Sequence, residues 1–113
     1  MIITQDIKTI TETIRKAVPA EKIYLFGSYA YGTPHENSDY DFYIIIPEDS
    51  MRPIEAMQKA HRALYVLGSS IPAVDVIAST QKSFDTMRGR INTIEKEVAR
   101  KGVLLYERHG MGA

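Results

Sequence analysis

Two aspartates spaced by one residue, Asp39 and Asp41, are the first residues of this sequence whose types and spacing could do chemistry. They open the segment DYDFYIII, whose apolar second half is rich in β-forming residues and predicts a central strand buried on both faces. Side chains alternate between the faces of a strand, so both carboxylates are expected on one face, with their Cα atoms roughly 6–7 Å apart. Such a pair repels unless a cation lies between the two or one is protonated. Oxygen ligands in this arrangement suit Mg²⁺ or Mn²⁺.

A third carboxylate, Asp75, interrupts the otherwise apolar segment VDVIA. An unpaired charge in a central strand is costly, so this residue is a candidate for a role in the same site. If strand 74–78 lies beside strand 41–46, the three carboxylates form a cluster of the kind that holds two metal ions about 3.5–4 Å apart and supports in-line phosphoryl displacement. Taken singly, each has a structural alternative, Asp39 as a turn residue and Asp75 as the partner of an arginine.

Gly27 and Ser28 stand ten residues ahead of the first aspartate. They follow the apolar run KIYLF at 22–26, which is predicted to be a strand, and residues 28–31 are expected to form a short helical turn. A turn from a strand into a helix exposes backbone N–H groups that can hold a phosphate, and the Ser28 hydroxyl can add a hydrogen bond. Alone, such a turn is usually structural. Beside an acidic metal site it indicates that one side binds a triphosphate and the other holds the metal ions.

The elements that must position these residues follow from the hydrophobic spacing of the chain. We expect an α/β (α+β) domain over residues 1–108, with a small mixed sheet of three or four strands covered by helices, and a flexible tail at 109–113. The predicted elements are helix 4–18, capped by Thr4 and ended by Pro19, strand 22–26, turn 28–31, strand 39–46, helix 53–67, strand 72–78, helix 80–88, helix 91–101 and edge strand 103–106. The apolar face of helix 53–67 is expected to comprise Ile54, Met57, His61, Leu64 and Leu67.

Composition argues against several classes of protein. The 113 residues are 44% hydrophobic and 25% charged, as in an ordinary globular domain. Fourteen basic and fourteen acidic residues cancel, which argues against broad binding of nucleic acid. The chain has no cysteine, so disulfides and thiolate metal sites are excluded. No apolar run approaches the roughly 20 residues of a membrane span, and the charged N-terminal stretch is unlike a signal peptide, so we expect a cytoplasmic protein that does not bind membranes.

Together these residues resemble the nucleotidyltransferase superfamily of the DNA polymerase β type. The signature of that superfamily is Gly-Ser, ten residues, Asp-x-Asp and a later carboxylate, represented here by Gly27-Ser28, Asp39, Asp41 and Asp75. The size of the chain and its ending, KGVLLYE at 101–107, resemble the minimal nucleotidyltransferase subgroup. The resemblance covers nearly the whole chain.

The resemblance implies a nucleotidyltransferase fold and a reaction. Members of the superfamily transfer a nucleoside monophosphate, often AMP from ATP, to an acceptor hydroxyl and release pyrophosphate. It further implies that Asp39 and Asp41 bind two metal ions, most often Mg²⁺, and that Asp75 binds the catalytic one and helps to deprotonate the acceptor. Gly27 and Ser28 would hold the β- and γ-phosphates.

The resemblance also suggests the acceptor. Larger relatives carry a second domain that completes the cleft, and 113 residues leave no room for one, so a separate partner or self-association is expected to supply the other wall. Minimal members commonly act with a helical HEPN-type protein, as an antitoxin that attaches AMP to the toxin. Two alternatives stay open: a homo-oligomeric enzyme acting on an aminoglycoside-like small molecule, and a non-catalytic module that binds nucleotide or masks a partner.

The chain departs from the family at two positions. Many minimal members have arginine or lysine two or four residues after the glycine, where this chain has Tyr29 and Tyr31. These two tyrosines cannot supply the positive charge that would bind the phosphates of the nucleotide. Lys82, Arg88 and Arg90 are the candidates to replace it.

Overall fold

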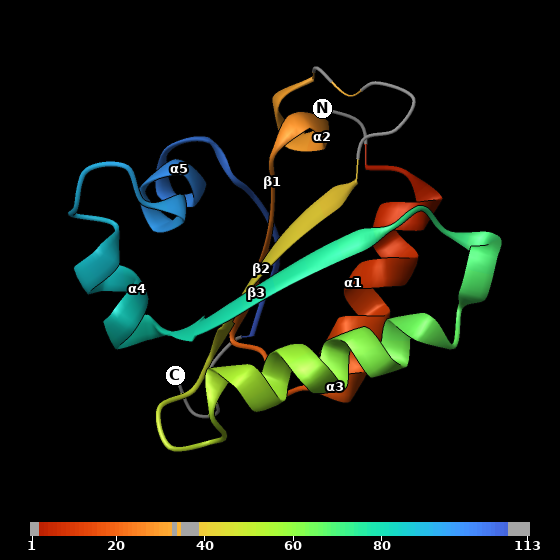
Figure 1. Cartoon of the computed structure of the whole chain (residues 1–113), viewed down its shortest axis with the longest axis horizontal. Helices are drawn as coiled ribbons and strands as arrows, with labels where there is room; N and C mark the ends of the chain where they lie inside the picture. The colour runs from red at the N-terminus through yellow and green to blue at the C-terminus, as the bar shows by residue number, and fades with distance from the viewer. Residues whose placement is uncertain (1–2, 33, 35–38, 109–113) are drawn as a thin grey trace.

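Four strands form a single mixed sheet in the order β3-β2-β1-β4 (Figure 1). The computed structural model describes residues 3–32, 34 and 39–108, so the predicted tail at 109–113 lies outside the described residues. Strand β2 (Tyr40–Ile46) is central and pairs antiparallel with β1 (Lys22–Phe26) and parallel with β3 (Val74–Thr80). Strand β4 (Val103–Glu107) pairs antiparallel with β1 at the edge. The small mixed sheet and its edge strand are therefore confirmed.

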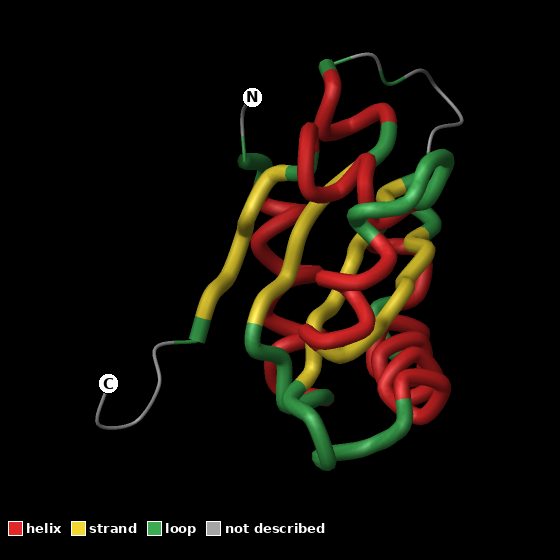
Figure 2. Tube along the Cα trace, turned by 90° about the vertical axis from the view of Figure 1, so that its left-hand side faces the viewer, coloured by secondary structure: helices red, strands yellow, loops and turns green. Residues whose placement is uncertain are grey.

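Helices cover both faces of the sheet, as Figures 1 and 2 show. Helices α1 and α3 lie over one face, and α4 and α5 lie over the other. A short helix, α2, directly follows β1, and a 3₁₀ turn, η1, follows α3. The bounds are α1 Gln5–Ala17, α2 Ser28–Tyr31, α3 Pro53–Tyr65, η1 Gly68–Ser70, α4 Gln81–Met87 and α5 Ile94–Lys101. No helix in the described part of the chain is both long and apolar enough to cross a membrane.

Strand β2 is apolar on both faces because it separates two cores. Phe42, Ile44 and Ile46 belong to the larger core beneath α1 and α3, while Tyr43 and Ile45 belong to the smaller core beneath α4 and α5. Since side chains alternate along a strand, the odd-numbered residues of β2 all point toward α4 and α5. The orientation of β2 therefore decides on which face an acidic residue at its start must project.

Helix α1 begins and ends where the sequence predicts. The Thr4 hydroxyl accepts a hydrogen bond from the Ile7 amide at 3.2 Å, which caps one of the free N–H groups of the first turn. Ile7, Ile10 and Ile14 are buried against the sheet. The helix ends at Ala17, two residues before Pro19.

The predicted apolar face of α3 is confirmed for Met57, Leu64 and Leu67, which contact the larger core, and is wrong for Ile54 and His61. Ala56, Ala60 and Leu64 are the buried residues, whereas Ile54 is 49% exposed and His61 is also exposed. Small side chains at positions four apart let α3 approach its neighbours closely, and alanine carries little weight in a search for large apolar residues.

The last helix starts later than expected. Thr93 caps α5, its hydroxyl accepting a hydrogen bond from the Lys96 amide at 3.0 Å, so Ile91 lies in the preceding turn and is 82% exposed. Gly102 is the C-cap, as predicted.

Candidate active site at one edge of the sheet

The three predicted aspartates come to the same end of the sheet, the end at which β2 and β3 begin, which is called the carboxylate edge below. Asp41 pairs with Asp75 across the parallel strands β2 and β3, and with Phe26 across β1. Asp39 lies just before β2 and is exposed. Asp41 and Asp75 lie at alternate positions with the residues that face α4 and α5, so the sheet presents these two carboxylates toward that layer. Asp39 is close enough to raise the pKa of Asp41.

Gly27 brings the turn after β1 directly against this edge. Its φ is +78°, which L residues with side chains rarely adopt. A Cβ placed on Gly27 would overlap Oδ2 of Asp41. Only glycine therefore allows the backbone of the turn to lie against the carboxylate.

Helix α2 grows out of this turn. The amides of Ala30 and Tyr31 donate to the Gly27 carbonyl at 3.0 and 3.1 Å, so the chain closes into a helix at Ser28. The first amides of a helix have no partner within it and point toward whatever precedes it. The Gly27-Ser28 turn thus has the local geometry expected for holding an anion beside Asp41.

The carboxyl group of Asp41 is electrostatically disfavoured as an anion. Its pKa is raised above the ordinary value, first by burial and then by the neighbouring carboxylates of Asp75, Asp39 and Glu97. Glu97 is a fourth acidic residue that the sequence did not indicate, because it lies on α5 and only tertiary packing brings it here. A cation placed among these groups would relieve the repulsion that raises this pKa.

The donor set suits a hard divalent cation. Carboxylate oxygens are the preferred ligands of Mg²⁺ and Mn²⁺. Among the described residues, no three acidic, histidine or cysteine side chains converge as a preformed metal site. Asp39, Asp41 and Asp75 share the carboxylate edge, so they are the residues that would hold such an ion.

The two tyrosines of α2 are packed against different parts of the protein, Tyr29 against the larger core beneath α1 and α3 and Tyr31 beside the carboxylates. The Tyr29 ring lies 4.1 Å from that of Tyr40, centroid to centroid, at an interplanar angle of 33°. The Tyr31 hydroxyl is buried near the Gly27 backbone and Glu97, without a hydrogen bond to either or to any other described residue. Burial, reinforced by the carboxylates of Glu97 and Asp41, raises the pKa of Tyr31 to about 12. Tyr31 therefore stays neutral.

A buried hydroxyl network holds α5 over the sheet. The Tyr43 hydroxyl donates to Oε2 of Glu95 at 2.7 Å and lies 2.8 Å from the Ser79 hydroxyl. Tyr43 is two residues beyond Asp41, on the same face of β2, and Glu95 is two residues before Glu97. The network thus ties β2, β3 and α5 together beside the carboxylates. Burial raises the pKa of Tyr43, so it remains a donor at neutral pH.

Replacing Tyr43 with phenylalanine is expected to destabilise the protein by about 1–3 kcal/mol, because it leaves Ser79 and Glu95 without their buried partner. Thermal denaturation measures the effect as a melting temperature several degrees lower. Tyr65→Phe is the matched control, since Tyr65 is 86% exposed and should tolerate the change. Equal melting temperatures for the two variants would show that the network contributes nothing.

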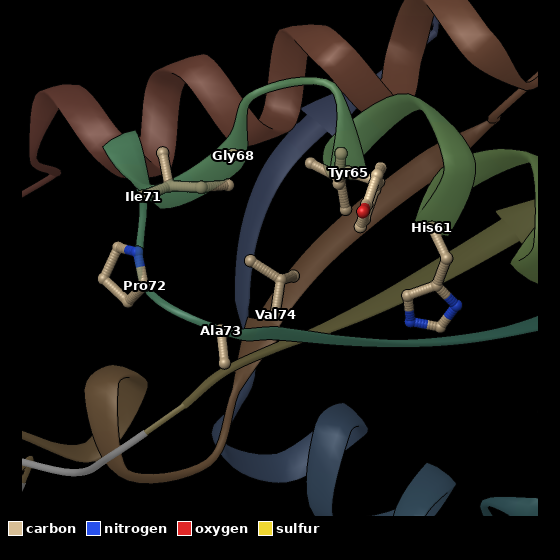
Figure 3. A pocket seen from close by; sticks show the side chains of 8 residues that line it. His61, Tyr65, Gly68, Ile71, Pro72, Ala73 and Val74 are labelled. Atoms are coloured by element: carbon tan, nitrogen blue, oxygen red, sulfur yellow. The ribbon is translucent and has the colours of Figure 1, made fainter.

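A groove of the described surface lies away from the carboxylates. It has a volume of about 340 Å³ and is formed by the end of α3, η1 and the approach to β3. Figure 3 shows His61 and Tyr65 of α3 facing Pro72, Ala73 and Val74 across it. Val74 and Leu64 belong to the α1/α3 layer, so this groove opens on the opposite side of the sheet from Asp41.

Comparison with known proteins agrees with this geometry. Residues 7–101 match the nucleotidyltransferase domain family. A protein adenylyltransferase, MntA of Shewanella oneidensis, is 35% identical over 68 residues, which are 59% of this chain and 48% of that protein. The chain thus spans about half the length of this curated relative.

Two crystal structures share the fold over most of the chain. One is a toxin-antitoxin with AMP-PNP, with a TM-score of 0.58 and 26% identity, covering 93% of this chain and 75% of the other. The second is a mutant of the toxin-antitoxin MntA-HpeT, with the same TM-score, 25% identity and the same coverage.

Proposed function

The chain belongs to the nucleotidyltransferase domain family, and from that premise we propose that it is a divalent-metal-dependent adenylyltransferase that modifies a hydroxyl group of a partner protein. The observation that carries the proposal is the pairing of Asp41 with Asp75 on parallel strands, with Gly27 against the Asp41 carboxylate. A structural role for these acids does not explain why carboxylates that repel one another are held together at the start of β2 and β3.

Each site residue has a distinct part in the proposed reaction. The Gly27-Ser28 turn holds the β- and γ-phosphates of ATP through its amides and hydroxyl. Asp39, Asp41 and Asp75 hold Mg²⁺, which would neutralise charge on the phosphates and on the acceptor oxygen. Most of the rate enhancement would come from positioning and charge stabilisation, as in other phosphoryl transfers.

The chemical step is a substitution at the α-phosphorus. The acceptor oxygen forms a bond to that phosphorus, the bond from phosphorus to the bridging oxygen breaks, and pyrophosphate leaves with the electron pair. Asp75 accepts the proton of the acceptor hydroxyl. Its exposed side chain, on the strand at the free edge of the described sheet, leaves room for a second protein to present that hydroxyl.

The partner we propose is a HEPN-type toxin, with this chain as its antitoxin. The similarity to a protein adenylyltransferase and to toxin-antitoxin structures supports this choice over a small-molecule acceptor. An aminoglycoside-like acceptor and a role in binding alone are the competing functions, and the following experiment separates them.

Incubation with α-labelled ATP and Mg²⁺ in the presence of a co-purified partner is expected to label that partner. Asp75→Asn should reduce labelling to about 1% or less, because it removes both a metal ligand and the proton acceptor. Asp85→Asn is the control, because Asp85 is exposed on α4, and should label normally.

Three results would contradict the proposal in different ways. Labelling that does not depend on Asp75 would place the reaction elsewhere. Labelling of small hydroxyl compounds only would favour the small-molecule enzyme. Absence of transfer to any acceptor, with ATP still bound, would leave a binding module.

A further inference from the structure

A basic groove lies on α5 next to the carboxylates. Its volume is about 170 Å³, and it lies on the helix that covers the face of the sheet carrying Asp41. Three of the lining side chains are cations and one is an anion. The groove is lined by Asn92, Thr93, Lys96, Glu97, Arg100 and Lys101.

Lys101, the last residue of α5, lies at the same end of the sheet as Gly27. Strand β4 begins directly after Gly102, and its first residue, Val103, pairs with Leu25, two residues before Gly27. A Cβ on Gly102 would come within 2.5 Å of the Val98 carbonyl oxygen, so only glycine permits this immediate turn from α5 into β4. Lys101 is thereby fixed beside the turn that follows β1.

Lys101 rests on the first turn of α2. Its Nζ lies 5.4 Å from the centre of the Tyr31 ring, at a distance where an ammonium is attracted to the face of an aromatic ring. Tyr31 is three residues after Ser28, which places both on the same side of the helix. Within the described residues Lys101 makes no ion pair, so its charge is available to an anion at this turn.

Two of the three cations suggested by the sequence, Lys82 and Arg88, lie elsewhere. Lys82 belongs to the first turn of α4, directly after the end of β3 that is opposite Asp75, roughly 20 Å along the strand. The Arg88 guanidinium lies 5.8 Å from the centre of the Phe84 ring, in the layer above the sheet. Neither stands at the Gly27 edge.

We propose that Lys101, supported by the Tyr31 ring, binds the β- and γ-phosphates of ATP and replaces the cation that Tyr29 and Tyr31 do not provide. The inference rests on the proposed function and adds a phosphate-binding residue to it. The lysine would act as a point charge beside the helix that begins at the Gly27-Ser28 turn.

The test compares binding of ATP and AMP by the full chain in Mg²⁺, using isothermal titration calorimetry. Lys101→Ala is expected to weaken ATP binding by about 10–100-fold, the effect of losing one charge-assisted contact, and to leave AMP binding within about threefold. Lys101→Arg should retain most of the affinity for ATP, since it keeps the cation. Lys82→Ala is the control and should match the unsubstituted protein.

The outcomes distinguish this inference from the function it builds on. If the unsubstituted chain binds ATP and Lys101→Ala binds it equally well, Lys101 is not a phosphate ligand and the adenylyltransferase proposal is unaffected. If Lys101→Ala weakens ATP and AMP equally, the residue does not act on the terminal phosphates, and the inference is again wrong. If the unsubstituted chain binds no ATP, both proposals fail. Melting temperatures of all variants show whether a loss of binding comes from unfolding.

Discussion

Replacing Asp41 with asparagine is expected to abolish nucleotidyl transfer and, at neutral pH, to make the protein more resistant to heat. The activity should fall by about 1,000-fold or more, because a lost carboxylate ligand removes several kcal/mol of charge stabilisation in the transition state. The melting temperature should rise by a few degrees, because the variant no longer places a carboxylate anion beside Asp75, Asp39 and Glu97. The shape of the side chain is kept, so packing against Gly27 is little changed.

The stability difference should depend on pH in a defined direction. The ordinary pKa of this carboxyl is 3.8, and folding raises it. The native state therefore binds this proton more tightly than the unfolded state does. Stability of the unsubstituted chain is lost as pH rises from the unfolded pKa through the raised one, and is constant above it.

Melting temperatures of the two proteins should therefore coincide near pH 3 and separate as the pH rises toward 7. Added Mg²⁺ should stabilise the unsubstituted chain and not Asp41→Asn, since only the former has the full ligand set. A variant that is less stable than the unsubstituted protein at pH 7, without Mg²⁺, would show that the carboxylate is stabilising, contrary to this account.

Replacing Gly27 with alanine should damage both stability and activity. Gly27 has φ 78° and ψ −164°, a backbone conformation that is essentially restricted to glycine and costs an alanine about 1–3 kcal/mol, and a Cβ there would also overlap the Asp41 carboxylate. Either the turn or the carboxylate must move, so we expect a total loss of about 2–4 kcal/mol and at least a 100-fold fall in activity.

Gly32, at the other end of α2, provides a control for the cost of a positive φ. Its φ is +77° and its ψ is 19°, in the left-handed helical region, and a Cβ there would have no neighbour within 4 Å. Gly32→Ala should therefore lose only the conformational part of the stability and should keep most of its activity. Chemical denaturation and transfer assays on both variants make the comparison. Equal effects on stability and activity would mean that contact with Asp41 is unimportant.

The carboxylate edge could be predicted because it depends only on strand geometry. The two-residue period of a strand puts Asp39 and Asp41 on one face, and an apolar run broken by a single acid identifies Asp75. The prediction required that the strands of Asp41 and Asp75 lie side by side. The structure confirms this, because β2 pairs with β3 and the two aspartates are in register.

The contribution of α5 could not be predicted in this way. Glu97 and Lys101 look like ordinary surface residues of a polar helix, and nothing in their spacing points to the strands. They reach the site because Tyr43 binds Glu95 and because Gly102 forces an immediate turn into β4. The buried alanines of α3 were missed for a related reason, since close approach between layers selects small side chains that carry little hydrophobic signal.

The alignment of β2 with β3 also has a consequence for folding. A shift of one residue would turn every side chain of β3 to the opposite face, burying Asp75 under α3 and presenting Val74 and Val76 to the solvent side of the site. The contact between the Tyr43 and Ser79 hydroxyls is lost in that arrangement, so this contact favours the native register over the shifted one. A misaligned chain would still be compact but would have no paired acids. The proposed activity therefore depends on the register in which these two strands pair.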